Sequence, residues 1–361
     1  MAFKTPPEVL LRSVLRNPRT SLCSIHVGQT QPRFQRAAVC FQLGKPLEIK
    51  QISVSDKPGR GQVLINVHAV GVNFSDILAC QGKYQVKAEL PFVPGYEVAG
   101  EVAGVGEDVH MFKRGDSVLA VSTDGIGAFS DSFITDQKLV HPVPEGVSKT
   151  KAAATLVSYA TALVGLTRKA AVKPGETVVV TAAAGSTGLA TVDLAAHSLG
   201  AKVIGVCGGS EKTALVLERG AHFAVDYKCE NVRDRLKDLT KGKGVNVVID
   251  HVGGDLFMQC LKSLAPEGRL VTVGYASGKI PDIPANLLLL KQCSVIGLFW
   301  GQTAVTNPPV FFQSMAQVLA ALKDKKIDPY CGKTFPLEQI NEAFDYVLQG
   351  KSMGKVIIEL K

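Results

Sequence analysis

The stretch Val178-Val-Val-Thr-Ala-Ala-Ala-Gly-Ser-Thr-Gly188 decides the fold of this 361-residue chain. An apolar strand runs directly into a glycine turn, and a helical pattern follows over 187–199. Gly185 and Gly188 take the second and third glycine positions of a GxGxxG fingerprint, and Ala183 takes the first. The second glycine lets the backbone approach a pyrophosphate, and the third lets the helix pack closely on the sheet. The strand–turn–helix context therefore predicts a dinucleotide site here.

Apolar strands and helical segments alternate around this turn. Strands are expected over 177–182, 202–207, 223–227, 246–252, 269–274 and 294–299, with helical segments over 187–199, 210–219, 230–241 and 255–264. Such alternation predicts a doubly wound parallel sheet with helices on both faces. Strands that are apolar throughout agree with burial on both faces.

The chain before this region has a different pattern. Short β-type runs split by Gly and Pro fill 36–147 and predict a β-rich domain, to which the final strand VIIEL (356–360) could return. We therefore expect an α/β protein of three parts. They are a leader over 1–35, a β-rich domain over 36–147 and 329–361, and a Rossmann nucleotide-binding domain over 148–328.

The cofactor is indicated by the end of the second nucleotide-domain strand. An NAD site ends this strand with an acid that accepts hydrogen bonds from the ribose 2′-OH. Here KVIGVC (202–207) ends in Gly208-Gly209-Ser210-Glu211-Lys212. Small residues leave room and Lys212 supplies a cation, which suits a 2′-phosphate and predicts NADP(H).

Composition excludes several classes of protein. No run of 18 apolar residues is present, so a membrane span is not expected. The formal net charge is +8, but residues 1–36 hold six basic residues and one acid, so a basic nucleic-acid face is not expected in the rest of the chain. The eight cysteines form no CxxC pair, which indicates reduced thiols and no zinc lobe.

The first residues have the pattern of a mitochondrial presequence. No acid occurs from Val9 through Pro46, and Val9, Leu10, Leu11, Val14 and Leu15 fall on one helical stripe beside two arginines. An arginine-rich, acid-poor amphipathic leader predicts import into the mitochondrial matrix.

The chain resembles the quinone oxidoreductase (zeta-crystallin-like) branch of the medium-chain dehydrogenase/reductase superfamily, from about residue 36 to the end. The resemblance rests on GVNFSD (71–76), QGKY (81–84), PFVPGYEVAGEVAGVGEDV (91–109), RGDSV (114–118), TAAAGSTGLA (181–190), DHVGGD (250–255), GRLVTVGYASG (268–278), IPANLLLLKQCSVIGLFWG (283–301) and GKVII (354–358). It implies that the β-rich part is a GroES-like catalytic domain, that the active site lies between the two domains, and that the protein is a homodimer.

The resemblance also implies site residues, position by position. On the nicotinamide side the resemblance places Asn73 and Asp76, with Thr161 in contact with the nicotinamide, and it places Lys355 where relatives use a cation. The pyrophosphate is held by Gly185, Ser186, Thr187 and Gly188, and the adenosine phosphate by Lys212 and Tyr227. The ribose and nicotinamide are lined by His251, Val273, Gly274, Phe299 and Trp300. The family more often has Gly-Val at Ser186-Thr187, a change that keeps the backbone amides.

A catalytic zinc is not expected. Zinc-dependent relatives carry Cys where Asn73 stands and His where Tyr96 stands. A catalytic zinc needs three protein ligands, and neither Asn nor neutral Tyr is a good one.

Three functions fit these residues. The leading one is NADPH-dependent hydride transfer to quinones or similar electron-poor conjugated carbonyls, a reaction that needs no strong acid. An enoyl-thioester reductase of mitochondrial fatty-acid synthesis is the alternative, because Tyr84 stands at the position of that family's catalytic tyrosine and a phenol can donate a proton. A third is an NADPH-binding protein with little turnover.

Overall fold

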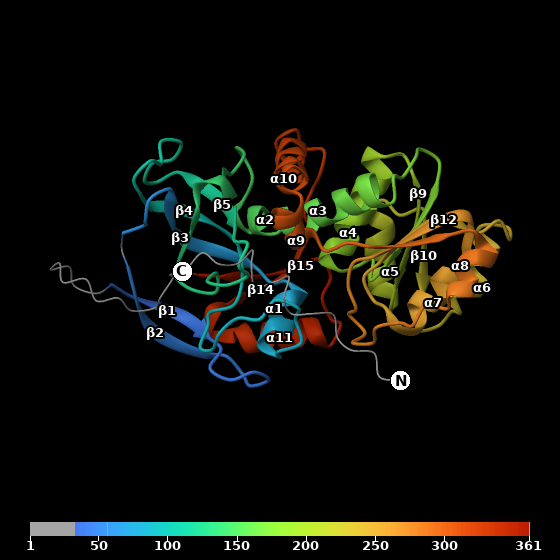
Figure 1. Ribbon diagram of the computed structural model, residues 1–361, viewed down its shortest axis with the longest axis horizontal. Helices are drawn as coiled ribbons and strands as arrows, with labels where there is room; N and C mark the ends of the chain where they lie inside the picture. The colour runs from blue at the N-terminus through green and yellow to red at the C-terminus, as the bar shows by residue number, and fades with distance from the viewer. Residues whose placement is uncertain (1–32, 56, 361) are drawn as a thin grey trace. The chain divides into compact units, whose positions relative to one another are not determined.

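Two large sheets carry the fold in residues 33–55 and 57–360, the part of the chain that the computed structural model describes (Figure 1). One is a parallel sheet with strand order β10-β9-β8-β11-β12-β13. Its strands are β8 (Thr177–Thr181), β9 (Lys202–Cys207), β10 (Phe223–Asp226), β11 (Val245–Asp250), β12 (Leu264–Thr272) and β13 (Ser294–Gly297). This is the 3-2-1-4-5-6 order of a Rossmann sheet, so the predicted fold class is confirmed.

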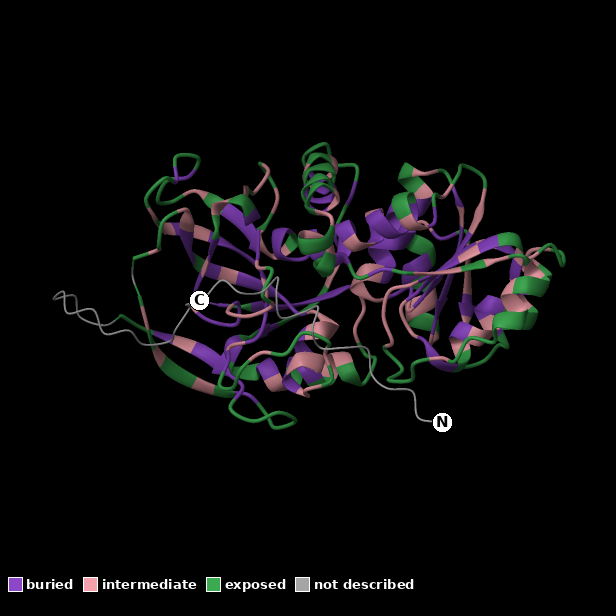
Figure 2. Cartoon of the chain, in the orientation of Figure 1, coloured by how far each residue is buried: buried purple, intermediate pink, exposed green. Residues whose placement is uncertain are grey.

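Helices connect these strands and cover both faces of the sheet. They are α4 (Ser186–Asp193, extended by a π turn over Leu194–Ser198), α5 (Ser210–Glu218), α6 (Val232–Leu239), α7 (Gly254–Lys262), α8 (Ala285–Lys291), α9 (Trp300–Thr306) and α10 (Pro308–Lys323). Figure 2 shows the central strands β8, β9 and β11 as mostly buried and the outer helix surfaces as exposed. Val178, Val179 and Val180 are all fully buried, because consecutive side chains of a strand point to opposite faces and helices cover both.

The second sheet has the order β14-β15-β3-β4-β5-β7, and β6 pairs with β3. Its strands are β3 (Gln62–Gly71), β4 (Glu97–Val105), β5 (Ser117–Val121), β6 (Ser132–Asp136), β7 (Val140–Pro142), β14 (Cys331–Pro336) and β15 (Lys355–Glu359). Strand β15 runs antiparallel to β3, with Ile357 opposite Gly71. The expected return of the last strand to the first domain is therefore confirmed.

Shorter helices join and flank the two sheets. They are α1 (Phe74–Cys80), α2 (Lys149–Ala153), α3 (Leu156–Leu163, continued by a π turn over Val164–Lys169), α11 (Ile340–Leu348) and the 3-10 turns Gln137–Leu139 and Leu337–Gln339. Helix α3 packs against α4, and residues of both sheets, such as Leu119 and Val180, belong to one buried cluster that includes α3. No helix of the described residues is long and apolar enough to cross a membrane.

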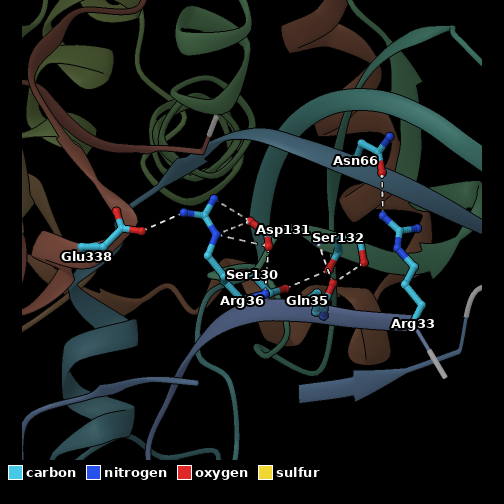
Figure 3. A network of polar contacts seen from close by, with 8 residues as sticks. All are labelled: Arg33, Gln35, Arg36, Asn66, Ser130, Asp131, Ser132 and Glu338. Carbon is cyan, nitrogen blue, oxygen red and sulfur yellow. Dashed lines mark hydrogen bonds and ion pairs between the residues drawn. The ribbon is translucent and has the colours of Figure 1, made fainter. Parts of the chain in front are cut away.

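The described body begins with a small sheet of β1 (Arg33–Val39) and β2 (Glu48–Val54). The Arg36 guanidinium pairs with Asp131 at 2.9 Å and with Glu338 at 2.7 Å (Figure 3). The buried Gln35 accepts a hydrogen bond from the Ser132 backbone N–H at 2.9 Å. The strand thus starts three residues before the boundary expected from sequence, since Gln35 is already part of the packed body. The predicted presequence helix lies outside the described residues.

Candidate active site

Strand β3 ends at Gly71, and the chain turns at once into α1, which carries Asn73 and Asp76. Asp76 Oδ2 accepts a hydrogen bond from the Asn73 backbone N–H at 2.8 Å, which fixes the start of the helix. Asp76 Oδ1 is buried and has no hydrogen-bond partner among the described residues. Burial raises the pKa of Asp76 to about 7, against the smaller lowering effects of the Asn73 N–H and Lys355. This carboxyl group therefore exchanges its proton near neutral pH.

Lys355 lies in the interior beside Asn73. Its Nζ donates to Asn73 Oδ1 at 2.7 Å and to Glu97 Oε2 at 2.6 Å, and Lys355 and Glu97 are each only 1% exposed. Glu97 Oε1 accepts from the Val157 backbone N–H at 2.8 Å. Glu97 thus links β4 to α3, and the Lys355 ammonium balances the charge of the Glu97 carboxylate. Lys355 lies beside the end of β3 because its strand, β15, pairs with β3.

Gly71 makes this arrangement possible. A Cβ at position 71 would lie 2.3 Å from the Ala153 carbonyl oxygen and 2.6 Å from Lys355 Cε. Any larger residue would push the buried lysine away from Asn73. The Lys355 ammonium donates to Asn73 and Glu97, and its expected contact with the cofactor stays a prediction.

Two tyrosines, Tyr84 and Tyr96, lie near the buried acid, and Phe299 contacts the first of them. The Tyr84 and Phe299 rings meet edge to face, with centroids 6.0 Å apart, and they come from opposite domains. Burial, and secondarily the charge of Asp76, raise the pKa of Tyr84 to about 12, so its phenol keeps its proton. The Tyr96 hydroxyl is hydrogen-bonded to Ser75 Oγ at 2.8 Å, and burial raises the pKa of Tyr96 well above its ordinary value. The site therefore holds two protonated phenols beside an acid that titrates near neutral pH.

The predicted phosphate turn has the geometry that the fingerprint requires. A Cβ at Gly188 would lie 2.2 Å from the Ala182 carbonyl oxygen, so only glycine lets α4 start this close to β8. Gly185 precedes α4, and no side chain caps the helix there. Ser186 Oγ lies 2.6 Å from Ser158 Oγ, which links the turn to α3. The Gly354 N–H donates to the Ala184 carbonyl at 2.8 Å, so the start of β15 borders the turn.

Unsatisfied polar side-chain atoms occur at the ends of β11 and β12. His251 Nε2 and Thr272 Oγ1 are buried and have no partner among the described residues. Burial lowers the pKa of His251 to about 4, so the imidazole is neutral. Val273 and Gly274 follow Thr272, and a Cβ at Gly274 would lie 3.7 Å from the His251 carbonyl. The glycine cradle and these unpartnered groups fit a dinucleotide whose hydroxyls would satisfy them.

Three further predicted site residues are Trp300, Thr161 and Thr187, and their surroundings differ. Trp300 is buried: its Nε1–H donates to Ser314 Oγ at 3.0 Å and its ring stacks on Phe311 at 4.7 Å. The indole packs α9 onto α10, and the neighbouring Phe299 is the more exposed aromatic group. The expected contact of Trp300 with the nicotinamide stays a prediction. Thr161 lies half-buried on α3, and Thr187 lies on α4.

Glu97 and Lys228 are missed by sequence reasoning. A charged residue at the start of the apolar strand EVAGEVAGV was the available signal for Glu97. Its partner stands 258 residues later, which no local pattern reveals. Lys228 follows Tyr227 at the end of β10, and a Cβ at Gly208 would lie 3.1 Å from its Cε.

Comparisons with known proteins agree with this architecture. Residues 59–145 match the model of the alcohol dehydrogenase GroES-like domain, and residues 186–321 match the zinc-binding dehydrogenase model. The chain is 46% identical to a quinone oxidoreductase-like protein 2 homolog of Nematostella vectensis over 100% of this chain and 99% of that protein. The chain belongs to the quinone oxidoreductase-like family of the medium-chain dehydrogenase/reductase superfamily.

Further members of this family show the same relation. Quinone oxidoreductase-like protein 2 of Mus musculus is 47% identical over 95% of this chain and 97% of its own length. The crystal structure of Escherichia coli quinone oxidoreductase complexed with NADPH superposes with a TM-score of 0.81 at 27% identity, over 91% of this chain and 99% of that one. The chain is thus an oxidoreductase of this superfamily.

Proposed function

We propose that the protein is an NADPH-dependent reductase that transfers hydride to quinones or related electron-poor conjugated carbonyls. The observation that carries the proposal is the protonated Tyr84 phenol, which contacts Phe299 of the nucleotide domain and lies within the electrostatic influence of the buried Asp76. NADPH supplies the hydride when it is bound. The residues that would hold it are the turn over 185–188, the unpartnered His251 and Thr272, and Lys212 with Tyr227.

The chain's own residues then position the acceptor and its proton. The aromatic edge of Phe299 and Tyr84 favours a flat, conjugated molecule. Asn73 is held in place by Lys355, and the Tyr84 hydroxyl remains a hydrogen-bond donor at neutral pH. A donor placed where charge develops on the acceptor oxygen lowers the barrier. Because a hydroquinone anion is stabilised by its own ring, these contacts suffice without a strong acid.

We propose that this reaction needs no zinc. Asn73 Oδ1 and Glu97 Oε2 bind the Lys355 ammonium, and the Tyr96 hydroxyl binds Ser75. A cationic side chain therefore already supplies positive charge where the zinc-dependent relatives have ligands. No group of three His, Cys, Asp or Glu side chains that could hold a metal ion occurs within 33–55 and 57–360.

The test is a turnover screen of the protein with NADPH and NADH against quinones, enals and short enoyl thioesters. We expect turnover with 9,10-phenanthrenequinone-type acceptors and a preference for NADPH. Binding of NADPH without turnover of any of these acceptors would favour the cofactor-binding protein with little turnover.

Enoyl-thioester reduction is a second candidate, favoured by the same Tyr84 phenol, whose raised pKa keeps the proton that carbon protonation requires. In that reaction Tyr84→Phe should lower kcat by about 10²–10⁴, the usual size of a general-acid contribution. With a quinone the loss should stay below about tenfold, because solvent can protonate the oxygen anion. Measuring kcat of both forms on a quinone and on a thioester separates the two functions.

We further propose that the protein is a homodimer in the mitochondrial matrix. Strand β13 is the outermost strand of its sheet, and the adjacent α8 exposes Leu289 (77%) and Leu290 (73%), so a second copy could cover this edge. Light scattering of the wild type and of Leu290→Glu tests the dimer. Import of the full chain, compared with a chain that lacks residues 1–32, tests the location.

A further inference from the structure

The ends of β9 and β10 lie side by side in the nucleotide domain. The two strands are parallel neighbours with Asp226 opposite Cys207. The Tyr227 N–H also donates to the Cys207 carbonyl at 3.1 Å. The residues after each strand therefore share one edge of the sheet, with Gly208 and Gly209 next to Tyr227 and Lys228.

Tyr227 and Lys228 fold over the end of β9. A Cβ at Gly208 would lie 2.7 Å from Tyr227 Cζ and 3.1 Å from Lys228 Cε. A side chain at position 208 would have to displace both groups. Lys228 thus reaches the strand end at which the ribose specificity of a Rossmann site is set.

Asp226 holds the two turns in register. Its Oδ1 accepts from the Gly209 N–H at 2.9 Å and from the Lys228 N–H at 3.0 Å. These two bonds, the Gly209 bond first, lower the pKa of Asp226. The nearby Glu230 accepts from the Asp226 N–H at 3.0 Å and pairs with Arg235 at 3.1 Å. Both acids at this edge are therefore occupied by backbone donors or by an arginine.

A second cation, Lys212, lies close to Lys228. Burial lowers the pKa of Lys212, and the charge of Lys228 lowers it further. Lys212 Nζ donates to the Gly350 carbonyl. In the part of the chain that the structure describes, neither ammonium group forms an ion pair with an acidic side chain. The Asp226 carboxylate acts on Lys228 through its charge without forming an ion pair with the ammonium group. Two neighbouring cations that form no ion pair suit a dianionic phosphomonoester.

We propose that Lys228 is a second cation for the 2′-phosphate of the cofactor, together with Lys212, and that Asp226 is the positioning residue that holds the Lys228 backbone against Gly209. This inference rests on the proposed NADPH function and assigns residues to one phosphate of it. Asp226 serves here through its backbone contacts and does not touch the ribose.

The test is calorimetric binding of adenosine 2′,5′-bisphosphate and of adenosine 5′-monophosphate to the full chain, which needs no turnover. Lys228→Met should weaken the bisphosphate by about tenfold and leave the monophosphate within twofold, because a charge-assisted hydrogen bond to the 2′-phosphate is lost. Lys212→Met should likewise weaken binding of the bisphosphate more than binding of the monophosphate. The matched control is Lys237→Met, which removes one exposed lysine from α6 and should leave both ligands unchanged.

The outcomes separate this assignment from the proposed function. If the wild type prefers the bisphosphate and Lys228→Met keeps that preference, Lys212 acts alone and the assignment of Lys228 is wrong. If the wild type binds both ligands equally, the NADPH function itself fails. Thermal melting of each variant shows whether it is folded.

Two substitutions of Asp226 test the positioning role. Asp226→Asn and Asp226→Ala both remove the charge, but only asparagine keeps an oxygen that can accept from Gly209 and Lys228. We expect the Asn variant to bind the bisphosphate at least as tightly as the wild type, and the Ala variant to bind at least fivefold more weakly than the Asn variant. Equal binding by the two variants would overturn the role. Weaker binding of the monophosphate by Asp226→Asn would instead mark Asp226 as an acceptor for the ribose 2′-hydroxyl.

Discussion

Removal of the buried Lys355 ammonium is the perturbation with the largest effect that the structure predicts. Lys355→Met keeps the length of the side chain and its apolar stem but takes away the charge. Glu97 would then retain only the Val157 N–H at 2.8 Å and the distant Asn73 amide at 3.4 Å. Breaking a buried ion pair by removing one partner costs about 3–5 kcal/mol of unfolding free energy. That is a large part of the roughly 5–15 kcal/mol by which a typical protein is stable.

Urea unfolding at neutral pH measures this loss. Trp300 is the single tryptophan and is buried against Phe311, so its fluorescence reports on the nucleotide domain, and circular dichroism reports on both domains. The double variant Lys355→Met/Glu97→Gln should recover at least half of the loss. Its glutamine can still accept from the Val157 N–H and carries no charge that needs a partner.

The control is Lys351→Met, an exposed lysine four residues earlier, which should change the unfolding free energy by less than about 0.5 kcal/mol. A loss below about 1 kcal/mol for Lys355→Met would refute the reasoning, as would a double variant no more stable than the single one. If the double variant regains stability but no longer binds NADPH, Lys355 also contacts the cofactor directly.

Three further predictions concern pH, metal and the start of the chain. The folded pKa of Asp76, about 7, lies above its ordinary 3.8, so the contribution of Asp76 to the unfolding free energy should fall as pH rises between about 4 and 7. The lowered pKa of His251 acts in the opposite direction and is common to both proteins, so urea unfolding of wild type and Asp76→Asn should show a difference that changes by ~4 kcal/mol across pH 4–8. Metal analysis should find no stoichiometric zinc, and a chelator should leave turnover intact; one zinc per chain would contradict the zinc-independent reaction. A chain that begins at Arg33 should have the same melting temperature as the full chain. A chain that begins at Ala37 loses the Gln35–Ser132 and Arg36–Asp131 contacts, and its unfolding free energy should be ~1–3 kcal/mol lower. Equal unfolding free energies would show that these contacts are dispensable.

Local sequence patterns determined the nucleotide domain. The inner strands β8, β9 and β11 are apolar along most of their length, since both of their faces are buried, and runs of this kind predict the six strands of the parallel sheet. The turn at Gly185 and Gly188 is equally local: the contact that forbids a Cβ at Gly188 is made with Ala182, six residues away. The absence of an acid directly after Cys207, which indicates NADP(H), could be read from the sequence because it too concerns neighbouring residues.

Only the tertiary structure decided the rest of the site. The sequence offered Lys355 as a cofactor ligand and Trp300 as a wall of the cleft. The contacts that these two side chains make in the fold come from the structure: the pairing of β15 with β3 places the lysine between Asn73 and Glu97, and the packing of α9 on α10 buries the indole against Phe311. These partners are brought together by strand order and helix packing, because a buried charge or indole N–H must find a partner wherever the fold provides one. The hydrophobic periodicity of the sequence indicates which face of a strand or helix is buried. It does not indicate which distant residue that face will contact.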